Sequence, residues 1–598
     1  MLLTLLLACA PEPVSFCEDG PRLRYRQGFE EGLTVWPDEH WAVSDSGSPT
    51  GLRLEFDREH AALVDYPDNY ADWFDFLSTL DGFGLTSGLF FRFDEPLGEA
   101  LLEDLFLVAL TEDGPIEVPF DARRIDLDTT ILMQPRRALP SATRVVAGLR
   151  TEPGKAGCAG PSSYLAELLD PEGRQVEHPL TRRYQEALVA LDLSPDQIAA
   201  MTVFTTQSAH RQSIQVAEIV QGIEHSLELV GCEVHGAWQR CEARFEAADF
   251  RDEERLVPPG GVEIRDHYEL PVSIWTPSDQ PGPFPIVLCG HGLGGDRDQC
   301  DAIVDEVVEQ GVAIVAIDAV EHGDHPTRGE AELELLEPLM IFAIRVSPPG
   351  LHGLRLRDNF RQSAWDKLQL IQALKAGLDL DGDEHSDLDG SRIAYAGVSL
   401  GAIMGPEPLA LSSDLRGGQL FVGGGRITQI IQDSPTFGLL IDLMKPNSMA
   451  EGDVDRAFPL LQTMVDPADP MIWAPYVQQD RWIDGPAPDI YLGAALDDEV
   501  VPNSTNELFA QAFAPPGVGR EVWPVQDIEF SAGSVLGNGP EGASLGFVQF
   551  ETITEGGIER AAEHDNVHDS DQGLAAIEAF FAPILRDDAH GLILDPQR

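Results

Sequence analysis

Residues 391–405 read SRIAYAGVSLGAIMG and carry the strongest structural signal in the chain. The apolar run at 393–396 predicts a buried strand, and GVSLG at 397–401 follows it directly, before small residues that can begin a helix. This is the G-x-S-x-G pattern in a strand–turn–helix context. A serine hydroxyl is a weak nucleophile, so Ser399 must project from a sharp turn toward a base, and such a turn leaves no room for Cβ atoms on either side. The alternative is a glycine-rich turn with no chemistry.

The sequence around this stretch alternates strand and helix patterns. Segment 283–295 (PFPIVLCGHGLGG) predicts a strand that runs into a glycine-rich turn, and 302–325 predicts a helix, a strand and a loop. Segment 358–378 has the amphipathic spacing of a helix that precedes the serine strand. Near-continuous apolar strands that alternate with helices indicate a parallel sheet covered on both faces. Ligands of such sheets bind beyond the carboxyl ends of the strands, where Ser399 would lie. We therefore expect an α/β catalytic domain over 216–590.

Residues 34–215 show a different pattern. Short alternating runs such as 88–93 (GLFFRF) and 143–151 (TRVVAGLRT) are separated by Pro, Gly and Asp, as in a β-sandwich. Helical spacing at 183–201 precedes a closing strand at 201–208. This half shows no nucleophile, metal cluster or phosphate loop. We expect a β-rich domain that packs on the catalytic part or shapes its substrate, although an adhesion module fits the same pattern.

Length and charge bound the function. A chain of 598 residues predicts two domains plus a leader rather than one core. Its 101 acidic against 40 basic residues give a formal net charge of −61. Such a surface repels nucleic acid and anionic lipid headgroups, so a nucleic-acid partner and peripheral membrane binding are not expected.

The first residues read MLLTLLLACA, a short apolar run that ends in LLAC and resembles the lipobox of a bacterial lipoprotein. This predicts a leader over 1–8, lipid on Cys9 and a polar tether over 9–33, with export and anchoring to a membrane or cell surface through the lipid alone. The run lacks Lys or Arg before it and is short for a signal core, so a stray apolar N-terminus is the alternative. The sequence after it contains no segment long and apolar enough to cross a bilayer.

The cysteines suit an exported protein. Cys232 and Cys241 enclose a short loop and are the first expected disulfide, and Cys17 with Cys158 is a second. Cys289 lies within an apolar strand, where we expect a small buried hydrophobic residue.

A second glycine-rich turn, HGLGG at 291–295, directly follows the apolar strand at 286–290. With GVSLG it resembles the α/β-hydrolases, in which the residue after HG and the residue after the nucleophile donate backbone N–H groups to the oxyanion. The resemblance implies Leu293 and Leu400 as these donors, Leu400 at the positive end of the following helix. A glycine turn without function is the alternative.

The same resemblance implies a triad in the chain order serine, acid, histidine. The segment DDEVVP resembles the loop that carries the acid, and Asp498 is preferred to Asp497 because the acid usually stands directly before x-V-V-P. Both His564 and His568 follow the expected last strand. His564 is preferred because its distance to the C-terminal helix resembles the family pattern, and His568 stays open as the alternative base for Ser399.

Within this family the chain resembles the bacterial virulence-factor lipase type, in which a β-rich N-terminal domain precedes the catalytic one. The segments that carry this resemblance are LDGFGLTSGLFFRF, QPRRALPSATRVVAGLRT, MTVFTTQS, PFPIVLCGHGLGG, RDNFRQSAWDKLQLI and AYAGVSLGAIMG, and they span most of the chain from about residue 34. That family usually has G-H-S-L-G at the nucleophile, whereas this chain has Val398 before the serine. The change weakens any expectation of true lipase specificity.

The loop DLDGDEHSDLDG at 379–390 has oxygen ligands at alternating positions, a pattern that suits a structural Ca²⁺ ion. The expected ligands are Asp379, Asp381, Asp383, Asp387 and Asp389. The loop lacks the bidentate Glu of a full EF-hand, and a solvated acidic loop is the alternative.

Residues 406–480 are apolar enough to form a cap over the site, with a continuation of the sheet plus packing helices as the alternative for the first part. These predictions combine into a serine hydrolase that cleaves carboxylic esters, whether small molecules or lipids, through an acyl-enzyme and without an organic cofactor. Amide or thioester hydrolysis on the same triad is a close rival. A surface lipoprotein with a relic hydrolase fold that binds partners or glycans is the rival from a different class.

Overall fold

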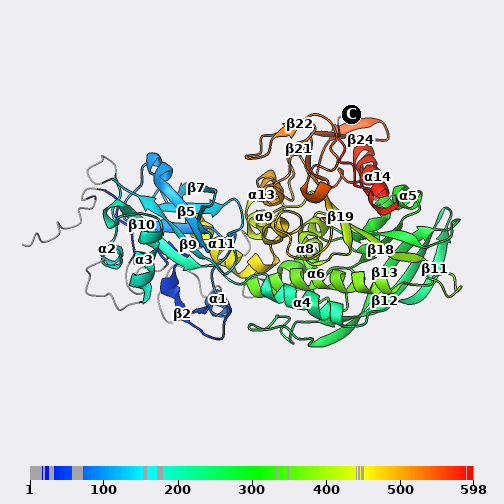
Figure 1. The fold of residues 1–598 in the computed structure, drawn as a ribbon, viewed down its shortest axis with the longest axis horizontal. Coiled ribbons are helices and arrows are strands. Elements are labelled where there is room, and N and C mark those ends of the chain that lie inside the picture. The colour runs from blue at the N-terminus through cyan, green and yellow to red at the C-terminus, as the bar shows by residue number, and fades with distance from the viewer. Residues whose placement is uncertain are drawn as a thin grey trace, which may run out of the picture.

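The computed structural model describes residue 17 and residues 20–25, 33–56, 72–152, 158–170, 179–331, 333–346, 349–438, 441, 445, 450–586 and 589–596. The chain forms a β-rich N-terminal part and a larger α/β part, which lie side by side in Figure 1. The leader, Cys9 and most of the tether lie outside the described residues, so the lipid anchor stays a prediction.

Two four-stranded antiparallel sheets make up the N-terminal part. The first has the order β1 (Val35–Trp36), β4 (Leu89–Arg92), β8 (Thr130–Pro135), β7 (Phe120–Ile125), and the second β10 (Ile198–Thr205), β9 (Arg144–Arg150), β5 (Leu105–Thr111), β6 (Gly114–Glu117). Helices α1 (Asp72–Leu77), α2 (Ser163–Leu169) and α3 (Pro179–Ala190) and the hairpin of β2 (Ala42–Ser44) and β3 (Leu52–Leu54) complete it. The predicted helix at 183–201 begins earlier and ends at Ala190, because 198–201 belong to the fully buried strand β10.

Within the described residues, the α/β part is built on one sheet of eleven strands. Their order is β11 (Glu228–His235), β12 (Trp238–Asp249), β13 (Asp266–Pro277), β15 (Ala313–Ile317), β14 (Phe284–Gly290), β18 (Leu388–Val398), β19 (Leu415–Phe421), β20 (Asp489–Ala495), β23 (Leu545–Phe550), β21 (Gly517–Val518), β22 (Phe530–Ser531). From β15 to β22 the neighbours are parallel, and β11, β12 and β13 add an antiparallel edge. The predicted mostly parallel sheet is confirmed.

Helices cover both faces of this sheet. On one face α6 (Gly353–Ala376) packs on β12 and β18, and α4 (Arg211–Gly222), α8 (Pro406–Leu411) and α13 (Asn503–Phe513) lie around it. On the other face α5 (Val304–Val308) and α14 (Asp571–Arg586) enclose a separate core. The core on the α6 face continues without a break into the N-terminal sheets, so the two parts share buried apolar surface.

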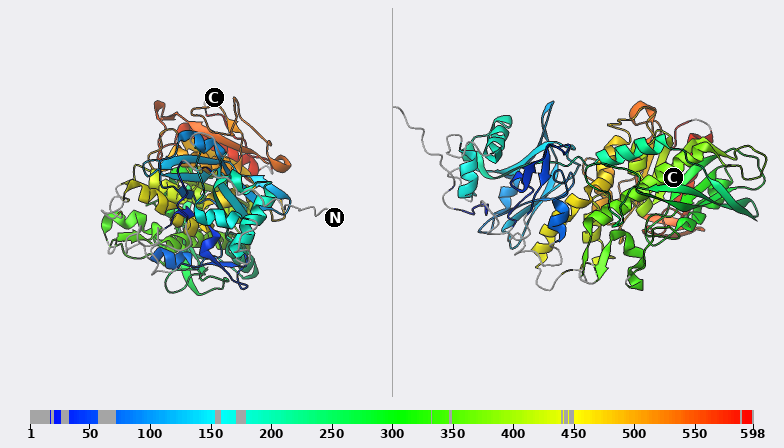
Figure 2. Two further views of the ribbon diagram at one scale, coloured as in Figure 1. Left: turned by 90° about the vertical axis from the view of Figure 1, so that its left-hand side faces the viewer. Right: turned by 90° about the horizontal axis from the view of Figure 1, so that it is seen from below.

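The remaining elements are short or lie between the two parts. They are α7 (Leu400–Met404), α9 (Ile427–Asp433), α11 (Glu451–Val465), α12 (Pro470–Trp473), the hairpins β16 (Ile344–Val346) with β17 (Pro349–Leu351) and β24 (Thr552–Glu555) with β25 (Ile558–Ala561), and the 3-10 helices η1 (Glu39–Trp41), η4 (Glu99–Asp104), η5 (Pro195–Gln197), η6 (Arg297–Ile303), η7 (Glu334–Phe342), η8 (Asp466–Ala468), η9 (Ala474–Tyr476) and η10 (Pro540–Gly542). Figures 1 and 2 both show α11 at the junction of the two parts.

Two predicted boundaries shift. The expected cap at 406–480 contains β19, which lies between β18 and β20 in the centre of the sheet, so the excursion begins only after Phe421. The boundary at residue 215 falls inside α4, which packs as a whole on α6. Among the described residues no helix combines the length and the apolar character that a membrane crossing needs.

Three disulfides are present among the described cysteines. Cys232–Cys241 joins directly opposed residues of β11 and β12, and Cys17–Cys158 closes the start of the N-terminal part, as the sequence predicts. The expectation that Cys289 is a lone hydrophobic residue is wrong, because it forms a disulfide with Cys300. This pairing depends on η6 folding back toward the end of β14.

Candidate active site

Ser399 lies on a strained turn between β18 and α7. Its backbone has φ 53° and ψ −115°, a conformation that a residue with a Cβ atom rarely adopts. The turn is held because Ser399 N–H donates to the Phe421 carbonyl at 2.9 Å. A Cβ on Gly397 would lie 2.7 Å from the Gly401 backbone, and one on Gly401 only 2.1 Å from the Gly290 carbonyl oxygen. Both glycines of the motif are therefore required by close packing.

The structure brings Ser399, His564 and Asp498 together in one hydrogen-bonded row. His564 Nε2 lies 2.8 Å from Ser399 Oγ, and its Nδ1 lies 2.8 Å from Asp498 Oδ2. A carboxylate only accepts, so Nδ1 carries the proton and Nε2 is free to accept from the serine hydroxyl. All three side chains are buried. This is the arrangement in which a histidine can act as base toward a serine.

The loop after β20 explains why Asp498 and not Asp497 takes part. The other carboxylate oxygen of Asp498 accepts the backbone N–H groups of Val500 and Val501, at 2.9 and 2.8 Å. Asp497 instead begins a left-handed turn with φ 57°, and its backbone N–H donates to Asn503. The V-V-P motif thus supplies the main-chain donors that orient the carboxylate.

His568 is placed elsewhere. It is half-buried and lines a cavity with Gly397, Val398 and Gln419, and desolvation by burial lowers its pKa. Among the described residues its Nδ1 has no hydrogen-bond partner. His564 therefore occupies the position between serine and acid, and His568 does not.

The loop after β14 lies against the serine. A Cβ on Gly292 would come within 3.5 Å of Ser399 Cβ, and Leu293 lines a pocket together with Ser399 and Leu400. Among the described residues, neither Leu293 nor Leu400 N–H donates to a protein acceptor. Gly401 N–H donates to the His291 carbonyl at 3.0 Å, which ties this loop to the serine turn. Two unpaired N–H groups beside a nucleophile can stabilise an oxyanion.

The His291 side chain fixes this loop, a role that sequence reasoning missed. Its Nε2 accepts the Ala319 N–H at 3.0 Å, so the proton lies on Nδ1, which donates to the Gly292 carbonyl at 2.8 Å. Carbonyl and N–H of one trans peptide point in opposite directions, so holding the Gly292 carbonyl orients the Leu293 N–H. Burial, and to a lesser extent the neighbouring His322, lower the pKa of His291 to about 3, which keeps the imidazole neutral.

Two further contacts restrain the same loop. Gln299 Oε1 accepts the Gly292 N–H at 2.7 Å, and the Cys289–Cys300 disulfide brackets the whole turn. The loop is thus held on both sides of Leu293.

A small apolar pocket opens at Ser399. The cavity has a volume of about 20 Å³, which is room for about one methyl-sized group. Its walls come from α6, η7, α7, α9 and the loops after β14 and β20, and the lining residues besides Ser399 and Leu400 are Leu293, Phe342, Phe360, Ile403, Ile427, Ile430, Phe437, Val500 and Val501. Three of these, Ile427, Ile430 and Phe437, belong to the excursion after β19. That part of the predicted cap does contact the site.

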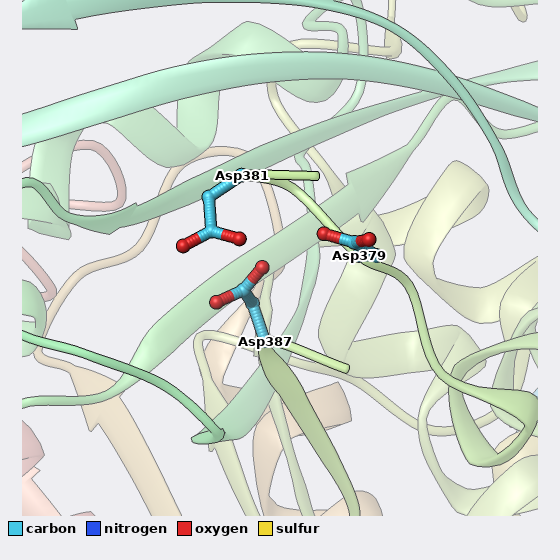
Figure 3. A group of neighbouring side chains, drawn as sticks. All are labelled: Asp379, Asp381 and Asp387. Atoms are coloured by element: carbon cyan, nitrogen blue, oxygen red, sulfur yellow. The ribbon is translucent and has the colours of Figure 1, made fainter. Parts of the chain in front are cut away.

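The acidic loop gathers three of its five expected ligands. Asp379, Asp381 and Asp387 offer oxygens within 4.8 Å of one another, and Figure 3 shows their carboxylates close together. Asp379 also accepts the backbone N–H groups of Glu384 and Gly382, which lower its pKa. Asp383 and Asp389 lie outside the group.

Asp383 instead accepts the His385 N–H and Asp389 pairs with Arg392 at 3.4 Å, which explains their absence from the cluster. An oxygen-only set of three suits Ca²⁺ in charge and ligand type. Among the described residues this is the one cluster with the geometry to hold a metal.

No family model matches the chain. The "Putative hydrolase YtaP" of Bacillus subtilis (strain 168) is 26% identical over 177 residues, which are 27% of this chain and 52% of that protein. The chain thus spans about half the length of this curated relative. Acetyl xylan esterase 1 of Thermoanaerobacterium sp. JW/SL YS485 is similar at a TM-score of 0.39 and 14% identity, covering 63% of this chain and 93% of that one. An acetyl xylan esterase of Paenibacillus sp. R4 has a TM-score of 0.35 and 16% identity, covering 53% and 85%.

The fold assignment rests on the chain's own geometry. The parallel sheet, the serine on a sharp turn after β18, and an acid and a histidine after later strands of the same sheet make the C-terminal part an α/β-hydrolase fold. The narrower resemblance to virulence-factor lipases stays a prediction.

Proposed function

We propose that this chain hydrolyses carboxylic esters through an acyl-enzyme on Ser399. The observation that carries the proposal is the row of two 2.8 Å contacts from Ser399 through His564 to Asp498, at the mouth of an apolar pocket. The two contacts place His564 between a hydroxyl that can donate to it and a carboxylate that can accept from it, which is the arrangement that the chemistry needs.

In the first half-reaction, Ser399 Oγ attacks the ester carbonyl while His564 Nε2 takes its proton. Asp498 stabilises the imidazolium, and the Leu293 and Leu400 N–H groups donate hydrogen bonds to the negative oxygen. The tetrahedral intermediate collapses, His564 returns the proton to the leaving alcohol, and the acyl group stays on Ser399.

In the second half-reaction, a water molecule gives its proton to His564 and attacks the acyl carbon. Collapse of the second intermediate releases the acid and restores the serine hydroxyl. None of these steps needs an organic cofactor. The net charge of −61 disfavours anionic substrates, so we expect neutral esters of small molecules or lipids and no nucleic-acid partner.

Labelling with a fluorophosphonate probe tests the nucleophile and base together. We expect Ser399→Ala to abolish labelling, His564→Ala to slow it strongly and His568→Ala to label like the wild type. Slow labelling in His568→Ala with normal labelling in His564→Ala would contradict the assignment of the base. Matched ester, thioester and amide substrates then separate the proposed reaction from its close rivals.

The rival from another class is a surface lipoprotein that binds partners or glycans on a relic fold. A folded wild type that neither labels nor turns over any ester would favour this rival. We further propose that the protein is exported and carries a lipid on Cys9, which mass spectrometry of the N-terminal peptide would detect. A structural Ca²⁺ ion at Asp379, Asp381 and Asp387 is also part of the proposal.

A further inference from the structure

The wall of the apolar pocket is held from the N-terminal part of the chain. Ile427 and Ile430 of α9 line the pocket beside Ser399, and Arg426 directly precedes this helix at its N-cap position. Arg426 is 3% exposed and adopts a left-handed conformation with φ 55°. Burying a guanidinium is costly unless its donors are satisfied, so its partners indicate what the burial achieves.

The donors of Arg426 reach across the domain junction. Its Nε donates to the Thr86 carbonyl at 3.0 Å, and Nη2 donates to the Pro135 carbonyl at the end of β8. The third contact, Nη1 to Gln429 at 2.7 Å, stays within α9. Two main-chain carbonyls of the N-terminal part therefore position the first turn of the helix.

Two buried carboxylates complete this clamp. Asp469 accepts the backbone N–H groups of Arg426 and Ile427, at 3.2 and 2.7 Å, and so caps the start of α9. Asp466 accepts the backbone N–H groups of Leu85 and Thr86 from the N-terminal part.

The side chain of Gln462 links both carboxylates, at 2.8 Å to each, and also accepts the Thr428 N–H at 3.1 Å. A Cβ on Gly84 would lie 2.4 Å from Asp466 Oδ2, so the N-terminal segment approaches as closely as its backbone allows. The whole network is buried, and no part of it belongs to the triad or the oxyanion loop.

We propose that the N-terminal part selects the acyl group: acting through Arg426, it holds Ile427 and Ile430 against Ser399 and restricts the substrate to short acyl chains. The inference rests on the proposed esterase function and names the substrate class of that site. The pocket has room for about one methyl-sized group, so an acetyl ester fits. Longer chains require α9 to move, and Arg426 opposes that movement. Arg426 is a positioning residue, since it contacts the pocket wall and not the reacting atoms.

The test compares kcat/KM on p-nitrophenyl acetate, butyrate, hexanoate and octanoate. The wild type should prefer acetate and lose at least tenfold by hexanoate. Ile430→Ala enlarges the pocket directly, and Arg426→Gln releases the helix. Both should raise the hexanoate-to-acetate ratio at least tenfold, and both should still react with the fluorophosphonate probe, which shows that Ser399 remains a nucleophile.

Arg426→Lys keeps the charge but donates to fewer carbonyls, so it should give an intermediate ratio and covers the case in which Arg426→Gln fails to fold. The control is Gln207→Leu, which removes the 2.8 Å hydrogen bond from Gln207 to the Thr463 carbonyl at the same junction. Among the described residues, the Gln207 side chain makes no hydrogen bond to α9. Its acyl profile should equal that of the wild type.

Failure of the inference and failure of the proposed function give different results. An active wild type that prefers octanoate, or Arg426 variants that fold, label and keep the wild-type profile, would overturn the inference alone. A change of the acyl profile in Gln207→Leu as large as in Arg426→Gln would show a general effect of the junction and would also overturn the inference. Absence of labelling and of turnover on every ester would instead refute the esterase itself.

Discussion

The role of His291 can be tested with two substitutions, each of which keeps one of the two hydrogen bonds of the imidazole. We expect one substitution to lower kcat and the other to lower stability. The imidazole makes two hydrogen bonds, from Nδ1–H to the Gly292 carbonyl and from the Ala319 N–H to Nε2. Asparagine places an amide group near the Nδ1 position and can keep the first hydrogen bond. Glutamine reaches the Nε2 position and can keep the second. Only the first hydrogen bond orients the Leu293 N–H.

The expected magnitude follows from the removal of a single hydrogen bond to the Gly292 carbonyl. A hydrogen bond contributes about 0.5–1.5 kcal/mol net, which corresponds to roughly 2- to 13-fold in rate at 1.36 kcal/mol per tenfold. Removing an oxyanion donor altogether lowers kcat roughly 100- to 1000-fold, which is the upper limit for the effect of losing this hydrogen bond. Because Gly295 N–H still donates to the Gly292 carbonyl at 3.2 Å, we expect His291→Gln to lower kcat by about tenfold, with KM unchanged.

His291→Asn should retain kcat within about threefold but lose stability, because the buried Ala319 N–H is left without an acceptor at a cost of roughly 1–3 kcal/mol. Steady-state kinetics on p-nitrophenyl acetate and thermal unfolding of both variants measure the two effects. The pKa of His291 is lowered to about 3, so the kcat defect should not change between pH 5 and pH 9. Equal kcat in the two variants, or a larger decrease in Asn than in Gln, would refute the reasoning.

Four further predictions concern other parts of the molecule. Asp498→Asn should lower kcat by roughly 10⁴-fold, because an amide favours the wrong tautomer of the base, and a wild-type rate would contradict the role of the acid. Millimolar Ca²⁺ should raise the Tm of the wild type and EDTA should reverse the rise, whereas the Tm of Asp379→Asn should not change. Equal Tm values in all samples would show that the acidic loop binds no Ca²⁺ and is only solvated. Burial raises the pKa of Glu407 to about 7, so its contribution to stability is complete below the unfolded pKa near 4.5 and is lost as pH rises through 7. Between pH 4.5 and 8, the unfolding free energy of Glu407→Gln, measured by urea titration, should therefore rise by up to roughly 3 kcal/mol relative to that of the wild type. A difference between the two proteins that grows toward low pH instead would contradict this prediction. In a Cys289→Ser, Cys300→Ser double variant, kcat should decrease while KM changes little, because the oxyanion loop is no longer restrained. An unchanged kcat in a folded double variant would show that the disulfide contributes to stability alone.

The chemistry of the nucleophile can be predicted because its requirements are local. The glycines around Ser399 are demanded by contacts within a few residues and with one neighbouring strand, and that demand is visible as a motif. The preference for Asp498 has a similar basis, since Val500 and Val501 provide the donors that the carboxylate needs. The choice between His564 and His568 is different in kind. Both stand in one loop, and only the packing of α14 and β18 decides which of them reaches the serine.

The features that the sequence did not reveal depend on segments that come together only in the folded chain. Cys289 looks like a core residue within its own strand, and its disulfide is visible only once η6 folds back on β14. Strand β19 follows a helix and a turn, so its apolar run fits a cap as well as it fits the sheet. Arg426 meets Thr86 across 340 residues of sequence, and no periodicity or motif connects them. Contacts of this kind are properties of the assembled core.

The hydrogen bonds anchor the two ends of α9 in different places. The end of α9 is tied to the loop of the acid, because Ser434 Oγ donates to the Glu499 carbonyl at 3.0 Å. The oxyanion loop and the serine turn are joined directly, since Gly401 N–H donates to the His291 carbonyl, and the acid's carboxylate is held by its own loop. The start of helix α9 is anchored instead in the N-terminal part through Arg426. Groups that do chemistry need positions fixed within a fraction of an ångström, whereas a pocket wall only has to exclude volume. Anchoring the start of α9 in the N-terminal part therefore lets that part influence which acyl group enters, while the catalytic groups are held by their own loops.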